Sequence, residues 1–238
     1  MVLVIRQPFW KLTMNADFYS PIVLSLQVAV VAACVCIVLA VPVARWLART
    51  EWPGSWIVQA IVNLPLVLPP VVTGLLLLVS LSPQGWLGYP LFHLLGIRVV
   101  LTWWAVLLAA VVVSFPLAVR PIQLAFQQSD QQLEQVARTL GASRRSTFWR
   151  IAFPLAVPGM IAGWLLAFAR SLGEFGATIM VAGNIKGVTQ TIPLAVYSKA
   201  HSTEFNDVWP LVIVSIILSC IALIVGQRIE LRSRKVRR

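Results

Sequence analysis

Charged residues are scarce in this sequence of 238 residues: they make up 11% of it, while 59% of the residues are hydrophobic. Soluble domains carry about 25% charged residues and about 45–50% apolar ones. The composition therefore excludes a soluble globular domain and a disordered chain, and it predicts a polytopic membrane protein. Since a helical span needs about 20 apolar residues, about five or six spans would leave little chain for a separate soluble domain.

Cysteine and histidine are also rare, with three and two residues respectively. The cysteines are odd in number and all lie within apolar runs, which argues against a disulfide framework or a zinc site. The sequence has no G-x-x-x-x-G-K-[ST] phosphate-binding loop, and no cluster of cysteines or carboxylates accompanies His93 or His201. We therefore expect no catalytic residue, no metal site, no bound cofactor and no ATP hydrolysis by this chain alone.

Acidic residues number 8 against 19 basic residues, which gives a net charge of +11. In a membrane protein such an excess is typical of Lys and Arg placed on the cytoplasmic side, next to anionic lipids. The charge therefore predicts contact with membrane lipid and not with nucleic acid. Residues 1–19 contain no apolar run of the kind found in a secretory signal, so we expect the first long run to remain as a span.

Five apolar runs without a charged residue are predicted to span the membrane. Thirteen of the 19 basic residues follow the first run, lie between the third and fourth runs, or follow the fifth. This distribution predicts an external N-terminus and a cytoplasmic C-terminus. The predicted spans are residues 21–44, 56–81, 99–119, 151–169 and 208–225.

The segment 175–197 is half apolar but is interrupted by glycines and a proline. As a sixth span it would place the Arg-rich tail outside, so we predict that it dips partway into the membrane without crossing it. Irregular backbone survives at that depth only when it is buried in protein or lines a water-filled cavity, which makes the segment a pathway candidate. An ordinary external loop is the alternative. The expected fold is all-α, with about five spans and six possible.

Three prolines, Pro65, Pro69 and Pro70, interrupt the second run. Each removes a backbone donor and bends or breaks a helix. A simple kink is one interpretation. The other is an unwound segment of the kind that builds transporter pathways, which makes Pro69 and Pro70 candidate pathway residues.

Arg170 and Glu174 form the one acid–base pair near membrane depth, and they share a helix face if the helix continues through them. They are either a local ion pair at the end of a span or, with Gly173 and Gly176, part of a gate. In the same run, Gly159 and Gly163 form a G-x-x-x-G step that permits close helix approach, either within the chain or across a dimer seam.

The polar loop 120–150 is predicted to hold a short amphipathic helix. Ser129 and Gln132 fit a capping box at its start, with Asp130 adding charge to the first turn, and Gly141 ends it. Ser143 can cap the helix that follows. The apolar face of this helix could lie on lipid, pack on its own protein or dock into a partner. That face consists of Leu133, Val136, Ala137 and Leu140.

The loop resembles the EAA motif of ABC importer permease subunits, which reads Glu-Ala-Ala, three residues, Gly, nine residues, Ile, one residue, Leu-Pro. The spacing is kept, but Gln135 replaces Glu, Val136 replaces Ala and Phe153 replaces Leu. Glu134 stands one position early and could supply the acid. The resemblance implies that the loop 129–150 couples the chain to an ATPase. The implied coupling residues are Glu134, Gln135, Ala137, Gly141, Ile151 and Pro154.

Three further stretches, 64–78, 133–143 and 168–197, resemble molybdate permeases within this family. The resemblance implies a type I ABC importer permease fold for a single domain, 1–238, in the bacterial inner membrane. It also implies a permease homodimer, a cytoplasmic ATPase dimer that binds ATP and Mg, an external binding protein and an oxyanion substrate. Uptake of sulfate, thiosulfate or tungstate is the alternative. An uncoupled channel or a membrane-embedded enzyme is less favoured.

Overall fold

The computed structural model describes residues 16–202 and 208–236, and within these ranges the chain is helical and contains no strand. The all-α prediction is therefore confirmed. Among the described residues, four helical segments are long and apolar enough to cross a membrane, and a bent pair of helices raises the number to five if it counts as one span. The four segments are Phe18–Arg49, Trp103–Gln128, Arg144–Leu172 and Trp209–Gly226.

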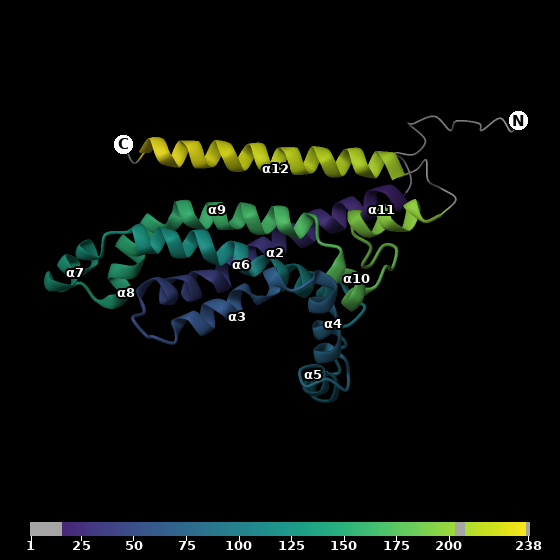
Figure 1. Ribbon diagram of the computed structural model, residues 1–238, viewed down its shortest axis with the longest axis horizontal. Coiled ribbons are helices and arrows are strands. Elements are labelled where there is room, and N and C mark those ends of the chain that lie inside the picture. Colours follow the sequence, from purple (N-terminus) through teal and green to yellow (C-terminus); the bar gives the residue numbers. More distant parts are fainter. Residues whose placement is uncertain (1–15, 203–207, 237–238) are drawn as a thin grey trace, which may run out of the picture.

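Three of these segments form the centre of the bundle. Helices α2 (Ala16–Arg49), α6 (Trp103–Gln128) and α9 (Phe153–Leu172) pack closely against one another. Many of the side chains buried between them are alanines, which allow the helix axes to approach closely. Helix α12 (Trp209–Val236) lies along α9 and remains largely exposed (Figure 1).

The G-x-x-x-G step lies inside this bundle. A Cβ added at Gly159 would come within 2.5 Å of the Ala125 Cβ, and one at Gly163 within 2.8 Å of the Ala118 carbonyl oxygen. Both neighbours belong to α6. Of the two alternatives, the structure therefore selects a contact within the chain.

The second predicted span is sharply bent. Helices α3 (Ser55–Val67) and α4 (Pro70–Leu81) are bent by 109° relative to each other. Of the two interpretations of the prolines, the structure therefore selects a break and not a simple kink. Leu68 is extended, with φ −65° and ψ 141°, as expected for a residue that precedes a proline. In Figure 1, α4 runs at a steep angle to α3 and leads toward α5 (Gly88–Leu95).

The segment 175–197 contains only short helices in the structure. Helix α10 (Gly176–Ala182) has seven residues and α11 (Ile192–Ala200) has nine, so neither can cross a membrane. Most of α10 is buried, and it packs against α4 and α6. The segment therefore does not span, and most of it packs against the bundle, whereas residues 185–188 are exposed.

The two ends of the bundle differ in what they carry. Figure 1 shows α7 (Gln131–Thr139), α8 (Arg144–Thr147), the α2–α3 turn and the C-terminal end of α12 at one end, with α10 and α11 near the other. We call the first of these the α7 end. The basic segments that were predicted to share one side of the membrane therefore lie at the same end of the molecule.

Candidate functional site

Helix α7 begins one residue later than its capping pattern suggested. Asp130 is the N-cap, and its side chain accepts a 2.8 Å hydrogen bond from the Gln132 backbone N–H. The predicted capping box at Ser129 is therefore wrong. Ser129 instead ends α6, where its hydroxyl donates to the Phe126 carbonyl at 2.8 Å. Asp130 takes the role because it directly precedes the first helical residue, where a side-chain oxygen reaches the free N–H groups.

The end of α7 is formed as predicted. Gly141 has φ +88°, a conformation that strains residues with a Cβ. The Ala142 N–H donates to the Ala137 carbonyl at 2.9 Å, and the Gly141 N–H donates to the Arg138 carbonyl at 3.0 Å. This is the Schellman pattern of helix termination. Ser143 then caps α8 by accepting a bond from the Ser146 N–H.

The two faces of α7 have opposite environments. Three residues of its apolar stripe are exposed: Leu133 by 50%, Val136 by 55% and Leu140 by 82%. Ala137 is half-buried, and Glu134, on the other face, is buried. The apolar stripe therefore does not pack on its own protein, which leaves lipid or a partner to cover it.

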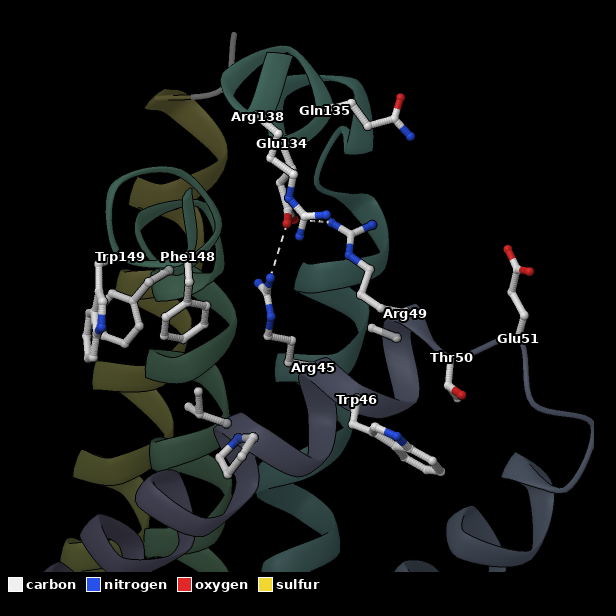
Figure 2. A pocket seen from close by; sticks show the side chains of 14 residues that line it. Arg45, Trp46, Arg49, Thr50, Glu51, Glu134, Gln135, Arg138, Phe148 and Trp149 are labelled. Carbon is white, nitrogen blue, oxygen red and sulfur yellow. Dashed lines mark hydrogen bonds and ion pairs between the residues drawn. The ribbon is translucent and has the colours of Figure 1, made fainter. Parts of the chain in front are cut away.

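Glu134 ties α7 to the end of α2. Its Oε2 accepts from Arg45 Nη2 at 3.1 Å, and its Oε1 accepts from Arg49 Nη2 at 2.8 Å (Figure 2). Arg49 Nη2 also donates to the Ser129 hydroxyl at 2.8 Å. We call these four residues the latch; they connect α2, α7 and the end of α6.

Aromatic rings hold one arm of the latch in place. The Arg45 guanidinium lies 4.7 Å from the centre of the Phe148 ring and 5.7 Å from that of Phe126, within cation–π range. In the sequence, Arg45 and Arg49 are the two basic residues that follow the first apolar run, and there they served only to predict topology. The available signal was their spacing of four residues, which matches that of Glu134 and Arg138 and places each pair on one helix face.

The remaining predicted coupling residues lie around α7. Gln135 is exposed on the helix itself. Ile151 is half-buried in the π-helical turn η1 (Phe148–Ala152), and Pro154 follows in the first turn of α9. A π-helical turn is a local irregularity in an α-helical segment. Here η1 connects the loop 129–150 to the span that contains α9.

The predicted gate residues come together where α9 ends. Helix α9 stops at Leu172, so Glu174 lies in the turn before α10 and not on a continuous helix. Arg170 Nη1 and Glu174 Oε2 are nevertheless 2.7 Å apart. The buried Glu174 also accepts a 2.8 Å bond from the Ala177 N–H through Oε1, which fixes the start of α10.

The same turn meets the break between α3 and α4. A Cβ at Gly176 would lie 2.8 Å from the Pro70 Cβ, so only glycine permits this approach. Gly173 leads into the turn, and Pro69 occupies the break. The hydroxyls of Ser114 on α6 and Ser171 on α9 form a buried hydrogen bond of 2.9 Å. This pair was not predicted from the sequence.

Several helices that are long and apolar enough to span a membrane, a bent helix pair packed against the short buried helix α10, and an exposed amphipathic helix between two spans indicate the membrane subunit of a transporter. The model of one protein family, "Binding-protein-dependent transport system inner membrane component", matches residues 37–238. The chain belongs to this family and is a membrane-spanning permease subunit of an ABC importer.

Curated relatives match nearly the whole chain. The molybdenum transport system permease protein ModB of Escherichia coli K12 is 42% identical, with 98% of both chains covered. ModB of Haemophilus influenzae is 45% identical over 91% of this chain and 95% of its own. A relative from Chlorokybus atmophyticus named "Probable sulfate transport system permease protein cysT" is 37% identical over 83% of this chain and 69% of its own.

Solved structures share the fold. A bacterial ABC transporter that imports the acidic polysaccharide alginate matches with a TM-score of 0.72 at 18% identity, covering 98% of this chain and 86% of its own. A bacterial alginate ABC transporter in complex with an alginate-bound periplasmic protein matches with a TM-score of 0.71 at 18% identity, covering 96% of this chain and 82% of its own. The importer permease fold predicted from the sequence is confirmed.

We predict that Glu134→Gln destabilises the chain, because it leaves Arg45 and Arg49 facing a neutral amide. The expected loss in the free energy of unfolding is about 1–3 kcal/mol, since charge-assisted hydrogen bonds are weakened in a partly buried site. Thermal unfolding of the purified chain in neutral detergent measures it. Glu51→Gln, an exposed carboxylate nearby, is the control and should change stability by at most about 0.5 kcal/mol. Equal melting temperatures for the two variants would contradict a stabilising latch.

Proposed function

We propose that this chain forms the translocation path of an ATP-driven molybdate importer as a homodimer, together with a cytoplasmic ATPase dimer and an external binding protein. The exposed apolar stripe of α7 is the observation that carries the proposal. The side chains of Leu133, Val136 and Leu140 are exposed on the surface of the chain, while the opposite face of α7 is held to α2 by the latch. A passive pore has no need of such a docking helix.

The α7 end is then the cytoplasmic side of a bacterial inner membrane, and the C-terminus lies there too. The excess of basic residues at this end supports the orientation. Docking of an ATPase on α7 would move the helix, and the latch would carry that movement into α2. ATP and Mg belong to the ATPase, since this sequence lacks a phosphate-binding loop.

Molybdate is favoured as the substrate by the relatives whose names specify molybdenum transport, because they match more of this chain at higher identity than the sulfate relative does. The meeting point of Pro69, Pro70, Gly173, Glu174 and Gly176 is the proposed gate, with Arg170 as the partner of Glu174. Sulfate, thiosulfate or tungstate uptake is the alternative.

The docking role of α7 is tested by Gly141→Val. A valine at residue 141, where φ is +88°, strains the backbone by about 1–3 kcal/mol and changes the orientation of α7 relative to the chain that follows it. The spans are untouched, so the permease should reach the membrane and yet retain the ATPase about tenfold to a hundredfold less well on co-purification. Gly96→Val is the matched control, because Gly96 also ends a helix at positive φ with open space around it, but on α5. Full ATPase retention by Gly141→Val would rule out α7 as the docking element.

The substrate assignment is tested in reconstituted vesicles that contain the permease, the ATPase and the binding protein. Uptake should require ATP and a loaded binding protein, and molybdate should outcompete sulfate. Equal uptake of sulfate and molybdate at the same concentration would contradict molybdate as the specific substrate and favour the sulfate alternative.

The gate is tested by Glu174→Gln. Loss of the carboxylate removes the ion pair with Arg170 and weakens the cap on α10. We expect an altered transport rate, or ATP hydrolysis without transport, while the permease and ATPase still co-purify. Unchanged transport and coupling would identify Arg170 and Glu174 as a local ion pair alone.

A further inference from the structure

The latch forms one wall of a pocket at the α7 end. The cavity has a volume of about 1020 Å³ and lies between the end of α2, the inner face of α7 and the turn η1 (Figure 2). Its lining combines arginines with aromatic rings. The residues that carry the argument are Arg45, Trp46, Arg49, Glu134, Arg138 and Trp149.

Positive charge in this pocket exceeds negative charge. Arg45 and Arg49 face it from α2, and Arg138 lines it from α7, one turn after Glu134. Glu134 has two oxygens, and both are already bonded to arginines. Glu51 is the other acidic residue in the lining, but it is exposed, and Figure 2 shows it pointing away from the cluster. Arg45 and Arg49 therefore share the single carboxylate of Glu134, and the exposed Arg138 adds a third positive charge at the edge of the pocket.

Several donors of the latch also lack acceptors. Arg45 Nη1, Arg49 Nε and Arg49 Nη1 are buried and make no hydrogen bond. A guanidinium carries five N–H donors and no acceptor, and buried donors left unpaired are unfavourable. A small group with several anionic oxygens, entering with modest side-chain shifts, would satisfy these donors and neutralise the excess charge. Arginine pairs with phosphate in this way through two parallel bonds.

The rim of the pocket indicates where such a group comes from. Trp46 and Trp149 line the pocket and are exposed at the ends of spanning helices. Tryptophans in this position are typical of the membrane–water interface, where phospholipid headgroups lie, and basic pockets between helices at that level bind anionic headgroups.

We propose that this pocket binds a phosphate-type oxyanion group, supplied by the headgroup of an anionic phospholipid or by dissolved phosphate, with the tryptophan rim favouring the lipid. The site is distinct from the gate and from the exposed stripe of α7. It requires neither an ATPase nor molybdate.

The test compares the full-length chain with Arg138→Gln and with Arg145→Gln. Arg138 lines the pocket but is not a partner of Glu134, so its variant keeps both ion pairs of the latch. Arg145 is an exposed arginine of the same loop outside the pocket lining, which makes it the matched control. One arm measures retention of phosphatidylglycerol against phosphatidylcholine by native mass spectrometry. The second arm measures the melting temperature in neutral detergent as inorganic phosphate is added at constant ionic strength.

Wild type and Arg145→Gln should bind alike, and Arg138→Gln about tenfold more weakly, as expected for the loss of one charged contact. A preference for phosphatidylglycerol that is lost only in Arg138→Gln identifies the lipid as the source. Stabilisation by inorganic phosphate alone, lost in the same variant, identifies the dissolved anion. The proposal is overturned if neither probe binds, or if Arg138→Gln and Arg145→Gln behave identically. Because no ATPase is present, these outcomes are independent of the proposed transport function.

Discussion

A chain in lipid must satisfy its backbone hydrogen bonds internally, and this constraint shapes the whole molecule. Most of the described residues lie in helices, whose backbone hydrogen bonds are internal, whereas Leu68 at the break between α3 and α4 is half-buried and Pro69 is exposed on the single chain. Helix α10 packs against α4 beside that break, with Gly176 close to Pro70. Helix α10 therefore supports one side of the break, and the same segment carries residues of the proposed gate.

At the α7 end the controlling interaction is electrostatic. One carboxylate, Glu134, joins two arginines of α2, so the short helix α7 is attached to a membrane-spanning helix without a core of its own. This attachment leaves the apolar stripe free to face outward. The latch also concentrates more positive charge than one carboxylate neutralises, so the pocket behind it is suited to an anion.

Local sequence rules predicted the elements themselves. Apolar runs located the spans, three prolines located the bend, and Gly141 and Ser143 marked the end of α7 and the start of α8. The spacing of the EAA-like motif also identified the permease family before any geometry was known. These features depend on residues within a few positions of one another, so they are visible in a linear pattern.

The partners of Glu134 were decided only by the tertiary structure. Arg45 and Arg49 are separated from it by 89 and 85 residues, and in sequence they were two of many basic residues. The tertiary structure alone also decided the close packing of Gly159 and Gly163 against α6 and the hydrogen bond between Ser114 and Ser171. Even Ser129, a plausible cap by its spacing, bonds Arg49 from a distant helix. Helix formation depends on neighbours along the chain, whereas each of these contacts depends on which helix faces pack together, and many distant residues determine that packing at once.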